Sequence, residues 1–184
     1  MDTDEISPFI VGKQIDLLPL NSEHVTIYAK WENLPKVRIF ARNIMPKTPD
    51  EMKKLLEPTE GRVKKDINFE IWHKKDKKLI GECGVNDINW YDKKAFLGLL
   101  IGESEYWGQN ICTEATKLIE EYAFNELNLN KLYALIFSPN KGSCRCAEKS
   151  GFIREATFKK DIFIDGEFVD TFGYSLLKEN WLKL

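Results

Sequence analysis

The segment 101–115 (IGESEYWGQNICTEA) is the part of the sequence that most strongly indicates a ligand site. It lies between an apolar run, expected to be a strand, and a segment with helical periodicity. A helix N-terminus leaves four backbone N–H groups unpaired and carries about half a positive charge, so it can bind a phosphate or pyrophosphate. The segment matches neither G-x-x-x-x-G-K-[ST] nor G-x-G-x-x-G. An ordinary strand-to-helix loop that turns at Gly108 is therefore an equally good interpretation of the residues alone.

The histidines and cysteines do not form a recognisable site. His24 and His73 are the only histidines, and there is no G-x-S-x-G motif, which argues against a histidine-based triad. Segment 144–146 is a C-x-C with no second pair to match it, which argues against a structural zinc site. We expect four free thiols, buried or half-buried, at Cys83, Cys112, Cys144 and Cys146.

The elements that must position segment 101–115 form a strand–helix–strand unit. Residues 96–101 are apolar at nearly every position, which predicts a central strand covered on both faces. Residues 113–127 have one apolar helical face, with Lys117, Glu120 and Glu121 on the other. Residues 132–137 form the next apolar strand. A helix between two strands predicts that the two strands are parallel.

The rest of the chain supplies further short elements. The sequence predicts strands at 14–20, 67–72 and 79–88, helices at 23–32, 48–56 and 140–149, and a closing hairpin of 162–164 with 168–169 around Asp165-Gly166. Pro35 is expected to end or turn the first helix. This order of elements predicts an α/β domain with a mixed sheet.

Length, charge and composition exclude several classes of protein. The 184 residues suit one domain, and 27 basic against 29 acidic residues give a net charge of −2, which argues against broad nucleic-acid binding. The longest apolar run, residues 95–102, is far shorter than the roughly 20 residues of a membrane span. The acidic N-terminus lacks a signal-peptide pattern. We therefore expect a soluble cytoplasmic protein with one domain over residues 1–184.

Segment 106–115 resembles the acyl-CoA signature of the GNAT-superfamily N-acetyltransferases, Q/R-x-x-G-x-G/A, which is often followed by Thr-Glu-Ala. In this alignment Trp107 takes the Q/R place, Asn110 the central Gly place and Cys112 the last small place. Asn tolerates left-handed backbone angles better than most residues, so the loop shape is expected to survive. A second segment, 140–152 (NKGSCRCAEKSGF), is similar to the family's N-x-x-S…E-K-x-G-F.

The resemblance extends over about Lys13 to Trp181, including the pattern of Trp31, Asn33 and Val37, and is closest to the RimJ/RimL type, which acetylates protein N-terminal amines. It implies the GNAT fold, which is α/β (α+β by some schemes): a mixed, mostly antiparallel twisted sheet with a central parallel, splayed strand pair and flanking helices. It also implies acetyl-CoA as co-substrate. The residues that would bind acetyl-CoA are Leu99, Leu100, Ile101, Trp107, Gly108, Gln109, Asn110, Ile111, Cys112, Thr113, Asn140 and Ser143.

The implied reaction is attack of a neutral amine on the acetyl thioester. A protein α-amine has a pKa of about 7.7–8.0, whereas a lysine at about 10.4 is almost wholly protonated, so an α-amine needs only a modest base. Glu82 is the first candidate for that base and Glu70 the second, although charged residues on strands usually face solvent. Ala147 stands where many GNAT enzymes have a tyrosine that protonates the leaving thiolate, and Ser143 is the remaining candidate donor.

Other functions remain open at this point. The amine acceptor is expected to be a peptide or a small molecule such as an amino sugar, polyamine or drug. The absence of a Gly at position 110 and of the tyrosine also leaves a non-catalytic acyl-CoA-binding domain as an alternative, and a nucleotide-binding α/β module is a weaker one. We expect no nucleic acid, metal or membrane partner, and a homodimer is left open.

Overall fold

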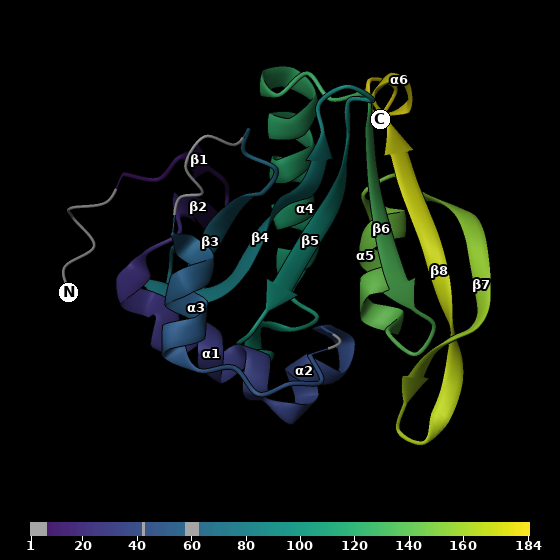
Figure 1. The fold of residues 1–184 in the computed structure, drawn as a ribbon. Helices are drawn as coiled ribbons and strands as arrows, with labels where there is room; N and C mark the ends of the chain where they lie inside the picture. Colours follow the sequence, from purple (N-terminus) through teal and green to yellow (C-terminus); the bar gives the residue numbers. More distant parts are fainter. Residues whose placement is uncertain (1–6, 42, 58–62) are drawn as a thin grey trace.

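The computed structural model describes residues 7–41, 43–57 and 63–184, and its main feature is one eight-stranded sheet (Figure 1). The strand order is β1-β2-β3-β4-β5-β6-β8-β7. The strands are β1 (Ile10–Val11), β2 (Ile15–Pro19), β3 (Ile67–His73), β4 (Lys78–Asn89), β5 (Lys94–Ile101), β6 (Lys131–Phe137), β7 (Ile153–Ile164) and β8 (Glu167–Leu177). Among these described strands, only β5 and β6 pair in parallel, and every other neighbouring pair is antiparallel. The expected mixed, mostly antiparallel sheet is confirmed.

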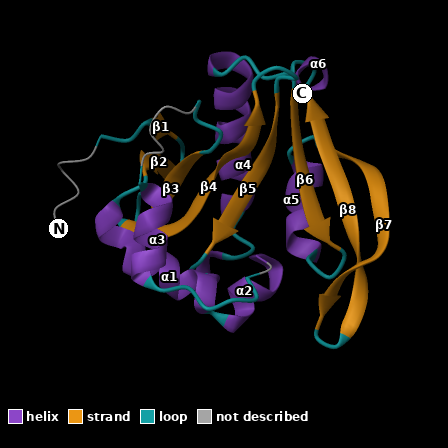
Figure 2. Cartoon of the chain, viewed as in Figure 1, coloured by secondary structure: helices purple, strands orange, loops and turns teal. Residues whose placement is uncertain are grey.

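Helices cover both faces of the sheet (Figure 2). The helical segments are η2 (Ser22–His24), α1 (Val25–Asn33), α2 (Pro35–Ala41), α3 (Pro49–Leu56), η3 (Ser104–Tyr106), α4 (Ile111–Glu121), the π-helical turn η4 (Tyr122–Glu126), α5 (Lys141–Lys149) and α6 (Lys178–Trp181). The larger apolar core lies between the sheet and α4, and a smaller one lies between the sheet and α1 and α3. None of the helices in the described ranges has the length and apolar character needed to span a bilayer.

Local sequence signals explain several element boundaries. The Thr48 side chain accepts a hydrogen bond from the Glu51 backbone, and the Glu51 carboxylate accepts one from the Thr48 backbone, which forms a capping box at the start of α3. Asp165 and Gly166 both have positive φ, 49° and 87°, as a two-residue hairpin turn requires. The strand, helix and hairpin predictions at these sites are confirmed.

The first helix ends before Pro35, as expected, and Pro35 is itself the first residue of α2, a position where proline is well tolerated. Other expectations about the elements were wrong. Helix α4 begins at Ile111, two residues before the expected start. Glu120 is only 1% exposed rather than on the solvent face, and its burial raises its pKa to about 8. Strand β5 is not covered on both faces to its end, because residues 98–101 are half-exposed.

The expectation of four free thiols was also wrong for two of the cysteines. Cys112, in the first turn of α4, forms a disulfide with Cys146 in α5, with 6.3 Å between their Cα atoms. Cys83 and Cys144 are free and buried. The disulfide was not recognisable in the sequence because its two cysteines are 34 positions apart and the fold alone brings them together.

The parallel pair is short. Strands β5 and β6 are in register only at Lys94–Phe96 and Lys131–Tyr133, and beyond this point they diverge (Figure 1). The edge of β5 that faces β6 is therefore unpaired from Leu97 to Ile101. The sheet is opened at its centre, as expected for a splayed pair.

Candidate active site

A groove of about 920 Å³ occupies the space between the diverging strands. Residues of β5 and β6 form its sides, the first turns of α4 and α5 border it, and residues of α2 also line it. Eleven of the twelve predicted binding residues lie in its wall, and only Gln109 does not. Those in the wall are Leu99, Leu100, Ile101, Trp107, Gly108, Asn110, Ile111, Cys112, Thr113, Asn140 and Ser143.

The backbone of β5 offers hydrogen-bonding groups to this groove. The Gly102 N–H donates to the Ile80 carbonyl across the β4 side at 2.9 Å, and in an antiparallel ladder the bonding direction alternates along the strand. Leu99 and Ile101 therefore direct their backbone groups toward the gap, whereas Leu100 faces β4. The Ile101 carbonyl already accepts a hydrogen bond from Trp107 Nε1 at 2.8 Å. Leu99 therefore has both its N–H and its carbonyl free to pair with a ligand amide, and Ile101 has its N–H free.

The loop before α4 has the backbone shape of an anion site. Gly108 and Asn110 both have left-handed angles, φ 78° and 62°, and Asn110 is the N-cap residue of α4. The first N–H groups of α4, at Ile111 to Thr113, precede the first intrahelical bond, which the Glu114 N–H donates to the Asn110 carbonyl. The asparagine in the place of the family's central Gly therefore keeps the left-handed turn that was expected of it.

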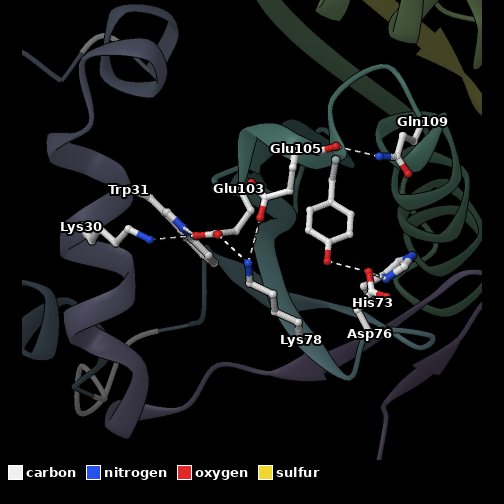
Figure 3. A network of polar contacts seen from close by, with 9 residues as sticks. Lys30, Trp31, His73, Asp76, Lys78, Glu103, Glu105 and Gln109 are labelled. Carbon is white, nitrogen blue, oxygen red and sulfur yellow. Dashed lines mark hydrogen bonds and ion pairs between the residues drawn. The ribbon is translucent and has the colours of Figure 1, made fainter.

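A polar network fixes this loop to the rest of the fold (Figure 3). Glu103 accepts hydrogen bonds from Trp31 Nε1 at 2.8 Å, Lys78 Nζ at 2.7 Å and Lys30 Nζ at 3.1 Å, and these donors lower its pKa to about 2. The loop is thereby attached to α1 and to β4.

The second half of the network holds η3 and the following turn. The Tyr106 hydroxyl donates to Asp76 Oδ2 at 2.7 Å, and His73 Nδ1 lies 2.9 Å from the same oxygen (Figure 3). Gln109 Nε2 donates to the Glu105 carbonyl at 2.7 Å. Because its side chain is used within the loop, Gln109 has a structural role there, which explains why it is absent from the groove wall.

Helix α5 contributes polar and basic groups. Asn140 caps the helix by accepting a hydrogen bond from the Ser143 N–H at 3.1 Å, so its side-chain oxygen is engaged, and Ser143 is half-buried at the groove. Three basic residues follow at helical spacing, i, i+4 and i+8, and all border the groove: Lys141, Arg145 and Lys149. Sequence reasoning missed them, although their spacing was a readable signal. Among the residues that the structure describes, none in the groove wall carries a carboxylate, which suits a polyanionic ligand.

The two candidate bases lie side by side next to the groove. Glu70 on β3 is directly opposite Glu82 on β4, and Glu82 is opposite Leu100 on β5, which lines the groove. Glu82 is half-buried, and its pKa is raised to about 7, first by desolvation and then by the negative charges of Glu32 and Glu70. Glu70 is only 1% exposed. The expectation that charged strand residues face solvent is wrong for Glu70.

Comparison with known proteins agrees with this geometry. A family profile described as an acetyltransferase (GNAT) domain matches residues 14–153. The putative ribosomal N-acetyltransferase YdaF of Bacillus subtilis (strain 168) is 29% identical over 168 residues, which cover 90% of each chain. The spermidine N(1)-acetyltransferase of Escherichia coli (strain K12) is 28% identical over 107 residues, which cover 58% of this chain and 57% of the relative.

A solved structure shows the same fold. The spermidine N-acetyltransferase from Vibrio cholerae, in complex with CoA and spermine, superposes with a TM-score of 0.84. The match covers 92% of this chain and 98% of that one, at 21% sequence identity. At this identity the similarity concerns the fold.

Proposed function

The chain belongs to the GNAT acetyltransferase family and is an acetyl-CoA-dependent N-acetyltransferase, and from that premise we propose that its acceptor is a protein N-terminal α-amine, with Glu82 as the general base. The observation that carries this proposal is the position and basicity of Glu82. Its half-buried carboxylate lies on β4, next to the groove-lining strand β5, and its pKa is raised to about 7. Similarity to a relative named as a putative ribosomal N-acetyltransferase over nine-tenths of both chains supports the same acceptor class.

The groove residues fit acetyl-CoA. The free backbone groups of Leu99 would pair with the pantetheine amides, as a strand pairs with a sheet edge. The first N–H groups of α4 would hold the pyrophosphate, and the basic residues of α5 would face its phosphates. Acetyl-CoA supplies the thioester that the amine attacks. Ser143, half-buried in the groove wall, is the proposed donor on the thiol side.

The basicity of Glu82 matches an α-amine. A base with a pKa of about 7 takes a proton from an ammonium of pKa about 7.7–8.0 at little cost, whereas a lysine-like amine at about 10.4 is a much poorer donor to it. Glu70 is the weaker candidate because it is buried and its carboxylate is already engaged by His24 and Tyr28. The subtype that acts on N-terminal amines, RimJ/RimL, is thus part of this proposal.

A polyamine is the second candidate acceptor. Glu32 and Glu70 both lie close enough to Glu82 to raise its pKa, and the summed negative charge of the three carboxylates would attract a polycation. Two relatives named as spermidine acetyltransferases support this alternative.

A CoA-release assay with three acceptors distinguishes these functions. We expect the highest kcat/KM for a short lysine-containing peptide with a free N-terminus, and little release with the same peptide after its N-terminus is acetylated. Spermidine is the third acceptor. A higher kcat/KM for spermidine than for the free peptide would overturn the α-amine proposal and support the polyamine.

The Glu82→Gln variant tests the base. Its kcat is expected to fall by about 10²- to 10⁴-fold while the Kd for acetyl-CoA is unchanged. Because folding raises the pKa of Glu82 from 4.5 to about 7, the free energy of unfolding of the wild type decreases as the pH rises from 4.5 to 7. A glutamine at this position does not titrate and causes no such decrease. The Tm of the variant at pH 8 is therefore expected to equal or exceed that of the wild type, which excludes unfolding as the cause. Wild-type kcat in this variant would remove Glu82 from the mechanism.

A further inference from the structure

Glu70 is held in a buried polar cluster on the face of the sheet that packs against α1. Its Oε1 atom lies 2.6 Å from His24 Nδ1, in η2, and also accepts a hydrogen bond from the Tyr28 hydroxyl, in α1. The Asn21 N–H donates to the same hydroxyl oxygen at 3.1 Å, and of the two acceptors for the hydroxyl proton the Glu70 carboxylate is nearer than the Asn21 carbonyl at 3.2 Å. Tyr28 has no exposed surface, and burial, followed by the effect of Glu70, raises its pKa above its ordinary value, so it remains a donor.

The sheet register connects this cluster to the groove. Leu18, Glu70, Glu82 and Leu100 lie opposite one another on β2, β3, β4 and β5. Directly opposite residues on antiparallel strands have Cβ atoms about 5 Å apart, so the two carboxylates are immediate neighbours. Leu100 lines the groove, so Glu82 separates the buried cluster from the site of the reaction.

We infer that Glu70 is a positioning residue: its carboxylate, fixed by Tyr28 and His24, acts on the amine-side proton transfer through Glu82. This inference rests on the proposed role of Glu82 as the base. Tyr28 and His24 hold Glu70 as an acceptor, and a carboxylate held so close to Glu82 disfavours a second negative charge there. Glu82 then binds a proton more readily than an isolated carboxylate, which makes it a stronger base for the incoming amine.

The groups around Glu82 also favour a higher proton affinity of its carboxylate. Glu70 faces it from β3, Glu32 and Tyr28 from α1, and the residue opposite it on β5 is the apolar Leu100. In the described parts of the chain, no lysine, arginine or histidine nitrogen lies within ion-pair distance of the Glu82 carboxylate. The electrostatic effects on Glu82 therefore come from negative neighbours, and Glu70 is the one whose position is fixed by two donors.

The pH profile of the Glu70→Gln variant measures this role. Glutamine has the same shape and still accepts a hydrogen bond from Tyr28, but it carries no charge. The acidic midpoint of kcat, near pH 7 in the wild type, is expected to fall, because one of the two negative charges that raise the pKa of Glu82 is removed. The ratio of kcat at pH 6 to kcat at pH 9 should then rise above its wild-type value of about one-tenth. A residue that only stabilises the fold would change the Tm and leave this ratio unchanged.

The Tyr28→Phe variant is a second, independent test. Removing the hydroxyl leaves the Glu70 carboxylate with one donor fewer, so the carboxylate is held less firmly opposite Glu82. The acidic midpoint should again move down, and the shift should disappear when the change is made in the Glu70→Gln background. Glu179→Gln, on the exposed helix α6, is the matched control and should leave the midpoint in place.

The outcomes distinguish a failure of the role inferred for Glu70 from a failure of the role proposed for Glu82. If Glu82→Gln abolishes activity but neither Glu70→Gln nor Tyr28→Phe moves the midpoint, the inference about Glu70 is wrong and the proposed base stands. If Glu82→Gln keeps wild-type activity and midpoint, the proposed base fails, and the inference fails with it. A lowered midpoint in Glu70→Gln, together with no further shift in the double variant, supports the inference.

Discussion

The side chain of Asn110 is engaged within the protein rather than pointing freely into the groove. Its Oδ1 accepts a hydrogen bond from Lys149 Nζ at 3.2 Å, between the loop before α4 and the end of α5. The left-handed backbone at this position was predictable from the sequence, because asparagine tolerates such angles. The partner was not predictable, because Lys149 is 39 positions away and meets Asn110 only in the folded chain.

This contact determines the expected effect of Asn110→Gly. Glycine keeps φ at 62° without strain, removes the side chain from the loop and releases the Lys149 ammonium to interact with a phosphate. We expect the Kd for acetyl-CoA to decrease about threefold, and to respond less when Lys149 is already alanine. Isothermal titration measures both.

The contrasting variant is Gly108→Val in the same loop. Gly108 has φ 78°, where a β-branched residue is strained by about 1–3 kcal/mol, so the Kd should rise tenfold or more. Unaltered affinity in both loop variants would place acetyl-CoA outside this groove.

At the scale of elements, the sequence predicted well wherever a local signal determined the structure. The capping residue Thr48, the Asp165-Gly166 turn and the strand–helix–strand order needed no tertiary information. The sequence predicted structure poorly where buried and exposed residues do not alternate regularly along an element. Strand β7 is exposed at most positions, so it lacks alternation and only its last residues were recognised. Glu70 is buried because Tyr28 and His24 reach it from a distant part of the chain, which no local pattern shows.

The disulfide between α4 and α5 gives a prediction at the same scale. Its cysteines are 34 positions apart, a loop for which the chain-entropy model gives about 3–4 kcal/mol of stabilisation. Adding a thiol reductant should therefore lower the Tm of the wild type toward that of a Cys112→Ser/Cys146→Ser double variant. The double variant is its own control, since its Tm should not respond to the reductant. A wild-type Tm that ignores the reductant, with free thiols detected by alkylation, would show that this bond does not form in solution.

At the scale of the whole molecule, the sheet consists of two parts joined by three residue pairs, β1 to β5 on one side and β6 to β8 on the other. If acetyl-CoA pairs with the free edge of β5, it takes the place of the missing strand contacts. Amide hydrogen exchange of Leu99 and Ile101 is expected to slow when acetyl-CoA is added. The amide of Leu100 faces β4 and should change less, so it serves as an internal reference. Equal exchange rates with and without acetyl-CoA at all three amides would contradict this mode of binding.

The short β5–β6 pairing also has a mechanical consequence. A load that pulls the β1–β5 part away from the β6–β8 part meets only three parallel residue pairs in the sheet, and behind the sheet it meets the Cys112–Cys146 bond and the Lys149–Asn110 contact. The two parts of the sheet are thus connected at the paired end of β5 and β6, and again by the contacts between α4 and α5. The groove lies between these two connections. Once the sulfur bond is reduced, the Lys149–Asn110 contact and the packing of α4 against α5 alone hold the two parts together behind the groove, so rotation about the paired end of β5 and β6 is opposed by fewer contacts.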